Sequence, residues 1–512
     1  MPSNSARPDS LPDPEVCERA RLSRDPRFDG LFYTAVTSTG IYCRPTCPAP
    51  APKARNVRYY RNAAAAEAAG FRPCLRCRPE LSPADGAWRR GDDTVARALK
   101  LIDQGLLAEQ PLSALAERVH VGERHLRRLF VDRLGAPPVG VHGTRRLLFA
   151  KQLLTETTLP ITEIALAAGF RSLRRFNATF LEAYGMAPRE VRKREPTGGG
   201  GTLSLRLGFR PPYDFAAMLD FLRGRALPGV EVVDATSYLR VVGDGAAPGW
   251  LRVSAPRGGE HALALELHGI APAQLLGVVE RVRRMFDLDA DPRAIGDVLA
   301  RDARLRALLR KRPGLRLPSG WDGFEIALRA VVGQQVSVAA ARTLTARIVG
   351  HFGTPVPESF AALGLRRTFP AADALAGADL AGLGLTAARA SAIRAIAAAL
   401  ADGRVDFRPE RTLDDFVARW TALPGIGPWT AQYIAMRALG HPDAFPAGDL
   451  VLRKHVPGDG SRLTTKALLA RAEQWRPWRA YAVVQLWRDA SPASKPVSSP
   501  TSRGTSPRRA AA

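Results

Sequence analysis

The sequence predicts a multidomain fold that is mainly α-helical with α+β parts. A chain of 512 residues is longer than one hydrophobic core usually supports. Glycines at 198–201 mark a flexible linker between two halves. Helical spacing of apolar residues dominates both halves, and strand-like alternation is concentrated just after the linker. We therefore expect a small cysteine-rich domain, a double helix-turn-helix domain, an α+β domain and an all-α domain.

The composition indicates an anionic polymer as partner. The formal net charge is +25 and the pI is about 10.8, a balance typical of proteins that bind nucleic acid. An acidic membrane surface is the competing interpretation. However, the sequence has no apolar run of about 18 residues and no Lys/Arg-flanked apolar segment at its start. We therefore expect no membrane partner, no signal peptide and a cytoplasmic location.

The cysteines predict a metal site in the segment 16–90, which follows a polar, Pro-rich segment at 1–15 that we expect to be disordered. Cys17 lies outside the pattern and is interpreted as a small buried thiol. The other cysteines form a C-x3-C pair and a C-x2-C pair, a spacing that suits one tetrahedral Zn²⁺, whereas unrelated buried cysteines are the alternative. The predicted zinc ligands are Cys43, Cys47, Cys74 and Cys77.

The residues around these pairs resemble the zinc domain of the Ada family. The matching stretches are Gly40-Ile-Tyr-Cys43-Arg-Pro-Thr-Cys47 and Ala69-Gly-Phe-Arg-Pro-Cys74-Leu-Arg-Cys77. The resemblance implies that Cys43 accepts a methyl group from a methylphosphotriester in DNA. A zinc-bound cysteine remains a thiolate and is therefore nucleophilic, so the metal would be both structural and reactive. Methylation removes a negative charge that faces DNA, so we expect binding to strengthen afterwards.

The segment 91–195 predicts two helix-turn-helix units. In each unit a short amphipathic helix, at 112–119 and at 161–170, precedes a second helix at 121–130 or 171–180. A basic helical bundle is the alternative interpretation. The repeated units resemble the AraC-type regulator domain. This resemblance implies binding to promoter DNA, transcription activation and contact with RNA polymerase.

Beyond the Gly linker at 196–202, the segment 203–290 predicts an α+β domain with no evident chemistry of its own. The stretches PPYDF and RMFDLDADP within it resemble the N-terminal domain of AlkA-type glycosylases, which is thought to brace the catalytic core. Expected strands lie at 203–210, 230–242, 250–254 and 262–267, and expected helices at 214–225 and 272–286.

The segment 291–490 predicts an all-α domain with a Gly/Pro-rich hairpin, and the basic tail at 491–512 is expected to be disordered. The hairpin reads Leu423-Pro-Gly-Ile-Gly-Pro-Trp-Thr-Ala431. Gly425 and Gly427 permit positive φ and close backbone approach. The amides that open the following helix form a phosphate site. After that helix and a loop comes Asp449.

This order of hairpin, helix, loop and aspartate resembles the helix-hairpin-helix DNA glycosylases, in particular those of the AlkA type. The resemblance implies double-stranded DNA as partner and extrusion of alkylated bases from the duplex. Asp449 would stabilise the oxocarbenium-like transition state and orient water. Trp429, Tyr433 and Trp487 would hold a cationic base such as N3-methyladenine by cation–π contact, although a core role is the alternative for Trp487. It also implies a monovalent cation at the hairpin, held by backbone carbonyls near Thr421, Leu423 and Ile426.

Two positions refine this expectation. Trp429 occupies the place of the lysine that strand-cleaving glycosylases use, so a monofunctional DNA-3-methyladenine glycosylase is expected. Gln335 occupies the place of the AlkA leucine wedge, which fills the gap left by the extruded base, so the substrate range is expected to differ. Two function classes follow. The first is a bifunctional alkylation-response protein, and the second is a transcription regulator whose glycosylase half has decayed into a DNA-binding platform.

Overall fold

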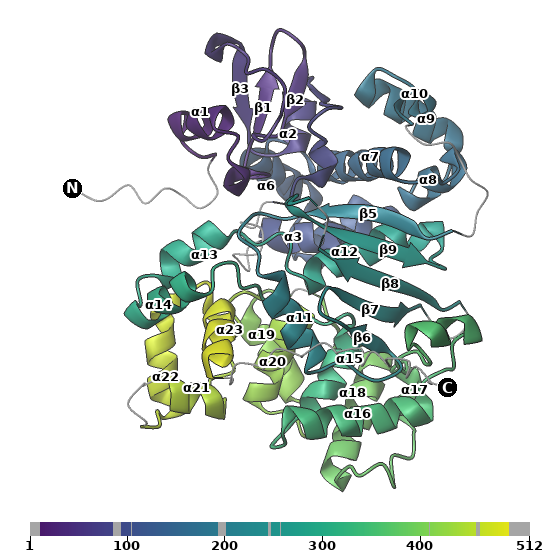
Figure 1. Ribbon diagram of the computed structural model, residues 1–512, viewed down its shortest axis with the longest axis vertical. Helices are drawn as coiled ribbons and strands as arrows, with labels where there is room; N and C mark the ends of the chain where they lie inside the picture. The colour runs from purple at the N-terminus through teal and green to yellow at the C-terminus, as the bar shows by residue number, and fades with distance from the viewer. Residues whose placement is uncertain are drawn as a thin grey trace, which may run out of the picture.

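The computed structural model describes residues 11–84, 94–103, 105–192, 201–243, 247–255, 258–408, 410–456 and 461–490. Most of the predicted N-terminal disordered segment and Gly linker, and all of the basic tail, lie outside these residues. Figure 1 shows the cysteine-rich part on one side of a central five-stranded sheet and the C-terminal helices on the other. The multidomain, mainly helical fold class predicted from the sequence is confirmed.

The cysteine-rich part is a small four-stranded sheet with strand order β3-β1-β2-β4. β1 pairs with β2 and β3 in antiparallel fashion, and β2 pairs with β4 in parallel. Tyr42, fully buried on β2, donates from its hydroxyl to Glu67 Oε1 at 2.8 Å and so fixes a helix on the sheet. The elements are α1 (Pro14–Leu22), η1 (Pro26–Phe28), β1 (Tyr33–Val36), β2 (Ile41–Cys43), η2 (Ala54–Asn56), β3 (Val57–Tyr60), α2 (Ala63–Ala68), β4 (Arg72–Pro73) and η3 (Pro79–Leu81).

The next part consists of helices only, and both predicted helix-turn-helix units are present. The first is α5–α6, with the turn at His120 (φ 59°), and the second is α8–α9, with the turn at Gly169 (φ 75°). The long helix α7 connects them. The elements are α3 (Thr94–Asp103), α4 (Leu106–Glu109), α5 (Leu112–Arg118), α6 (Glu123–Leu134), α7 (Pro138–Glu156), α8 (Ile161–Ala167), α9 (Leu173–Tyr184) and α10 (Pro188–Val191).

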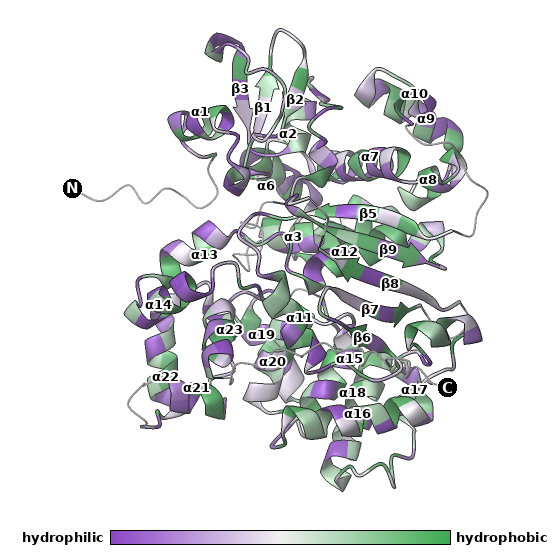
Figure 2. Cartoon of the chain, viewed as in Figure 1, coloured by the Kyte–Doolittle hydropathy of each residue, from purple (hydrophilic) through white to green (hydrophobic). Residues whose placement is uncertain are grey.

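The α+β part forms an antiparallel sheet with strand order β5-β9-β8-β7-β6. The expected strand at 230–242 is two strands, because Asp234 accepts hydrogen bonds from the amides of Thr236 and Ser237 and turns the chain. Figure 2 shows hydrophobic residues on α12 and the strands beside it. The elements are β5 (Leu203–Gly208), α11 (Phe215–Arg223), β6 (Glu231–Val233), β7 (Ser237–Val242), β8 (Gly249–Ser254), β9 (Ala262–His268), η5 (Pro272–Gln274) and α12 (Leu275–Met285).

The C-terminal part is helical around one large core that includes the fully buried Trp420 and Ile434. Asp side chains cap several of its helices; Asp322, for example, accepts from the amides of Phe324 and Glu325. The elements are α13 (Pro292–Leu299), α14 (Ala303–Lys311), α15 (Gly323–Val332), α16 (Val338–Phe352), η6 (Glu358–Leu363), α17 (Asp373–Ala376), α18 (Ala387–Ala401), α19 (Leu413–Thr421), α20 (Pro428–Ala438), α21 (Leu450–His455), α22 (Thr465–Ala472), η7 (Glu473–Trp475) and α23 (Arg479–Ala490).

The second helix-turn-helix unit and the five-stranded sheet share one hydrophobic core across the Gly linker. Phe176 and Phe180 of α9 belong to the same buried cluster as Leu205 of β5 and Val279 of α12. The side chain of Gln152 on α7 donates to the carbonyl of Arg206 at 2.8 Å. The linker therefore joins two segments that pack against each other.

Arg210 joins the cysteine-rich part to the α+β part. Its side chain is completely buried, and its guanidinium donates to the carbonyl oxygens of Asp29 (2.7 Å), Asp289 (2.9 Å), Pro83 (3.2 Å) and Ala84. The amide of Ala84 in turn donates to Asp289 Oδ1 at 2.8 Å.

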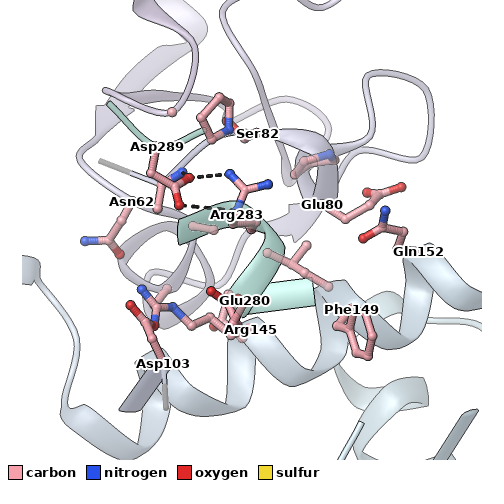
Figure 3. Close-up of a pocket in the computed structure, with 18 of the residues that line it drawn as sticks. Asn62, Glu80, Ser82, Asp103, Arg145, Phe149, Gln152, Glu280, Arg283 and Asp289 are labelled. Atoms are coloured by element: carbon pink, nitrogen blue, oxygen red, sulfur yellow. Dashed lines mark hydrogen bonds and ion pairs between the residues drawn. The ribbon is translucent and has the colours of Figure 1, made fainter. Parts of the chain in front are cut away.

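Beside this contact lies a cavity of about 170 Å³ where the cysteine-rich part, α7 and α12 meet. Figure 3 shows Arg283 paired with Asp289 across it, and Arg145 beside Asp103 and Glu280.

We predict that Arg210→Ala lowers the stability of the whole chain by roughly 3 kcal/mol, because buried carbonyls from two parts lose their donor. Denaturant unfolding, with limited proteolysis to detect separation of the two parts, measures this effect. Arg301→Ala, at an exposed arginine, is the matched control and should stay within about 0.5 kcal/mol of the unsubstituted chain. Equal stability of the two variants would contradict the assigned role of Arg210.

Candidate functional site

The parallel pairing of β2 and β4 brings the two cysteine pairs together. Cys43 is the last residue of β2, and the amide of Cys74 donates to the carbonyl of Tyr42 at 3.0 Å, directly beside it. The Sγ atoms of Cys43, Cys47, Cys74 and Cys77 lie within 4.8 Å of one another. Four sulfur atoms at this separation form the donor set of a tetrahedral zinc site.

Backbone amides donate hydrogen bonds to two of the sulfur atoms. The amide of Arg44 donates to Cys77 Sγ and the amide of Arg76 to Cys74 Sγ, each at 3.3 Å. Hydrogen bonds from Cys43 hold the pKa of Cys74 well below its usual range and lower the pKa of Cys47 to about 7. The same network raises the pKa of Cys43, through its bond with Cys47, and the pKa of Cys77, through its bond with Cys43. Two of the four thiols are thus readily deprotonated, and a bound metal would displace the protons of the other two. The residues present therefore fit one Zn²⁺.

Exposure distinguishes the cysteines from one another. Cys43 and Cys47 are half-buried, whereas Cys74 and Cys77 are buried. Cys17 is fully buried away from the cluster, and its Sγ donates to the carbonyl of Pro12 at 3.3 Å. Burial, with Asp13 nearby, raises the pKa of Cys17 to about 12, so this thiol is unreactive, as the sequence predicted.

The second helices of both helix-turn-helix units present basic faces. On α6 the exposed side chains include Arg124, Arg127 and Arg128, while Leu126 and Phe130 face the core. On α9 Arg174 and Arg175 are exposed, and Phe176 is buried. Each helix therefore has an apolar face anchored in the fold and a basic face free for the DNA major groove.

The hairpin between α19 and α20 is exposed and anchored by buried Leu423 and Ile426. Gly425 has φ +77°, and a Cβ added there would lie 2.8 Å from the Cβ of Ala392 on α18. Gly427 is different. Its φ is −90°, and an added Cβ would meet nothing within 4 Å among the described residues. Gly427 begins α20 without a side-chain cap, so the first amides of that helix remain available to a phosphate.

Asp449 is the N-cap of α21, and its Oδ1 accepts from the amide of Leu452 at 3.0 Å. Two predicted cleft aromatics contact the same carboxylate. The indole Nε1 of Trp429 lies 3.4 Å from Asp449 Oδ2, and that of Trp487 lies 3.3 Å from Oδ1. Tyr433 stacks on Trp429 with ring centroids 5.2 Å apart and lies 6.2 Å from Trp487. The structure thus places Asp449 and the three aromatic residues in one constellation.

These residues line a cavity of about 370 Å³, large enough for a purine base. Other parts of its wall come from residues that the sequence motifs do not indicate. Trp321, Arg225 and Arg437 line it, and Arg437 donates to the Tyr433 hydroxyl at 3.0 Å. Arg225 comes from the α+β part, which therefore contributes to the cavity directly. These residues come from different segments, so the periodicity of a single helix or strand does not predict that they line one cavity.

Buried ion pairs connect the two parts behind this cavity. Arg329 of α15 pairs with Glu231 of β6 at 2.7 Å, and Arg240 of β7 pairs with Glu325 of α15 at 3.0 Å. The Tyr238 hydroxyl donates to Glu231 at 2.7 Å. These pairs fix the sheet against α15 and so fix the cavity wall that it supplies.

Gln335 lies at the connection between α15 and α16, exposed and with φ +55°. A non-glycine residue in this region of φ is uncommon and needs support from its neighbours. Gln335 thus lies in a short exposed turn beside the hairpin, and the neighbouring Gln334 donates to the hairpin carbonyl of Gly425 at 2.9 Å. The sequence motif contained Gln334 but gave it no role.

Family models cover most of the chain. The "Metal binding domain of Ada" matches residues 16–80, and a "Helix-turn-helix domain" matches residues 115–194. The "AlkA N-terminal domain" matches residues 204–322, and the "HhH-GPD superfamily base excision DNA repair protein" matches residues 328–479. Among the described residues, no helix is both long enough and apolar enough to span a bilayer.

One relative matches nearly the whole chain, and others match one part of it. "Probable bifunctional transcriptional activator/DNA repair enzyme AlkA" of Mycobacterium tuberculosis is 41% identical over 485 residues, 93% of this chain and 96% of the relative. "DNA-3-methyladenine glycosylase 2" of Escherichia coli is 33% identical and covers 55% of this chain and 95% of its own length. "Bifunctional transcriptional activator/DNA repair enzyme Ada" of Escherichia coli is 37% identical and covers 36% of this chain and 49% of its own length.

The similarity to the mycobacterial relative includes both halves, and each half separately matches an Ada or an AlkA protein. The chain therefore belongs to the family of bifunctional transcriptional activators and DNA repair enzymes that join an Ada-type zinc and helix-turn-helix part to an AlkA-type DNA glycosylase.

Proposed function

We propose that this chain senses methylated phosphates in DNA through Cys43 and excises alkylated purines, as a monofunctional DNA-3-methyladenine glycosylase of type II, through Asp449. The observation that carries the proposal is the pair of constellations on one chain: the cysteine cluster, and the carboxylate held beside two indoles. A regulator that has lost catalysis has no need for an aspartate held beside a base-sized cavity. Release of alkylated bases decides between these two functions.

The sensing step is a transfer of one methyl group. A zinc ion bound by the cluster would keep the sulfur atoms deprotonated and so supply a nucleophile at neutral pH. Cys43 and Cys47 are half-buried, unlike the buried Cys74 and Cys77, so exposure favours the first pair. Within that pair, the choice of Cys43 rests on its resemblance to the acceptor cysteine of the Ada family. The Cys43 sulfur forms a bond to the methyl carbon, the carbon–oxygen bond breaks, and its electron pair stays on the phosphate as a diester. The thioether is not readily reversed, so each molecule acts once.

The first prediction for this site is that the full chain holds one Zn²⁺ and that Cys74→Ala loses it after dialysis against a chelator. Elemental analysis measures the metal content. Cys17→Ala is the matched control, because this thiol lies outside the cluster and should leave zinc binding intact. Stoichiometric zinc in the Cys74→Ala variant, or none in the unsubstituted chain, would contradict the assignment.

The second prediction is that methylphosphotriester DNA transfers its methyl group to Cys43 alone. Peptide mass analysis after incubation locates the added methyl group. Affinity for promoter DNA should then rise, because one negative charge near the phosphates is lost. A methyl group on Cys47, Cys74 or Cys77 would refute the assigned acceptor, and unchanged DNA affinity would remove the sensing role.

For base excision we assign Asp449 as the group that stabilises positive charge at the sugar carbon and orients the attacking water. The contacts that support this role are the two indole N–H groups beside its oxygens and the amide of Leu452, which together hold the carboxylate in one orientation. Trp429, Tyr433 and Trp487 offer electron-rich faces to a cationic base. Trp429 has no amine, so no Schiff base with the sugar can form and the strand stays uncut.

The third prediction concerns Asp449→Asn. Asparagine can still cap α21, so the fold and most DNA binding should persist. Release of 3-methyladenine should fall on the order of 10²-fold or more, because a charge that acts in the transition state is removed. Chromatography of bases released from alkylated DNA measures the rate. Asp402→Asn, at an exposed aspartate, is the control. Full activity of Asp449→Asn, or a covalent complex trapped by borohydride, would refute the mechanism.

The remaining parts of the proposal follow from these activities. The hairpin of Gly425 and Gly427 binds a DNA phosphate. A monovalent cation binds the hairpin carbonyls near Thr421, Leu423 and Ile426. Gln335 enters the gap left by the extruded base. The helix-turn-helix part recruits RNA polymerase to the promoter. We place the protein in the cytoplasm, on the nucleoid, and assign 16–90, 91–195, 203–290 and 291–490 as its domains.

A further inference from the structure

We infer that Gln334 is a positioning residue that links the wedge residue Gln335 to the phosphate-binding hairpin. Binding of the DNA backbone by the hairpin and insertion of Gln335 into the duplex are thereby coupled. The inference rests on the proposed function of Gln335 and the hairpin. It assigns to Gln334 a role that differs from contact with DNA.

The side-chain amide of Gln334 makes two bonds to the hairpin. Nε2 donates to the carbonyl of Gly425 at 2.9 Å and to the Thr430 hydroxyl at 3.1 Å. Gly425 is the hairpin residue with positive φ, and Thr430 lies in the first turn of α20, next to Trp429. One amide therefore holds both the turn that meets phosphate and the start of the helix that carries the aromatic residues.

The backbone of Gln334 is held from a third direction. The guanidinium of Arg389, at the start of α18, donates to the carbonyl oxygen of Gln334. Ala392 of the same helix contacts Gly425 so closely that only glycine fits there. Gln334 thus connects three segments by hydrogen bonds: the turn between α15 and α16, the hairpin, and α18.

These hydrogen bonds of Gln334 explain the backbone conformation of Gln335. Gln335 has φ +55°, a conformation that costs a non-glycine residue on the order of 1 kcal/mol or more unless its surroundings enforce it. Bonds at the side chain and carbonyl of Gln334 enforce it from one side. With the turn so held, Gln335 stays exposed to solvent.

Pre-organisation of this kind matters only when the lesion must be pulled out of a stacked, paired duplex. Extrusion costs least for a base that has no partner. A residue that acts by holding the wedge should therefore affect matched and unpaired lesions differently. A residue that only supports the fold should affect both equally.

The test measures single-turnover base release from duplexes that carry one N7-methylguanine, placed opposite cytosine or opposite an abasic analogue. Gln334→Met keeps the length of the side chain and removes its donors. It should slow release from the matched duplex by about tenfold, the scale of lost hydrogen bonds of this kind, and release from the unpaired lesion by about twofold or less. The ratio between the two substrates does not depend on the fraction of folded protein. Gln474→Met, at an exposed glutamine whose amide donates to the carbonyl of Arg471, is the matched control.

A double-mutant cycle with Gln335→Ala shows whether Gln334 acts through the wedge. In that background Gln334→Met should add little, because the group it positions is already gone. Equal slowing on both substrates, or full additivity with Gln335→Ala, would overturn the inference while leaving the proposed glycosylase in place. Absence of base release by the unsubstituted chain would instead overturn the proposed function, and this inference with it.

Discussion

The buried guanidinium of Arg210 is the contact on which the arrangement of the two halves depends. It is fully buried. Among the described residues its hydrogen-bond acceptors are carbonyl oxygens from the cysteine-rich part and from the segment after α12. A buried cation of this kind needs every one of its donors paired, and separation of the parts would leave both the cation and the carbonyls without partners. The halves are therefore held as one body. The shared core of the second helix-turn-helix unit and the five-stranded sheet has the same effect.

This arrangement places the cysteine cluster close to the contact between the halves. Arg44, the residue after Cys43, donates from Nε to Asp29 Oδ1 at 2.9 Å, and the carbonyl of the same Asp29 receives Arg210. The cluster, its neighbouring arginine and the junction thus form a continuous chain of hydrogen bonds. The cysteine-rich part is therefore packed directly against the α+β part of the glycosylase half and is not connected to it by a flexible linker alone.

The glycosylase cavity shows the same reliance on contacts between parts. Asp449 and its aromatic neighbours come from the C-terminal helices, but Arg225 and the ion pairs of Glu231 and Arg240 come from the α+β part. The α+β part, which carried no recognisable chemistry in the sequence, therefore supplies a wall of the cavity and holds α15 in place. Removing it would change the cavity itself as well as its support.

The sequence by itself determined which residues carry chemistry in local motifs. The paired spacing of Cys43, Cys47, Cys74 and Cys77 predicts a metal site, and the pairing of β2 with β4 brings the two pairs together. The period of apolar residues predicted both helix-turn-helix units and the strands of the sheet, except that β6 and β7 were expected as one strand. Even so, Gly425 and Gly427 look alike in the sequence, and only the structure separates them, because Ala392 of a distant helix crowds Gly425 alone.

Only the tertiary structure decided how distant segments meet. The bond from Gln334 to Gly425 spans 91 positions, and that from Arg210 to the Asp29 carbonyl spans 181. Periodicity and motif spacing report on neighbours along one helix, strand or loop, so they carry no signal for such pairs. The sequence predicted roles for Gln335, for the hairpin and for Cys43, and the packing of the chain decided what holds each of them in place.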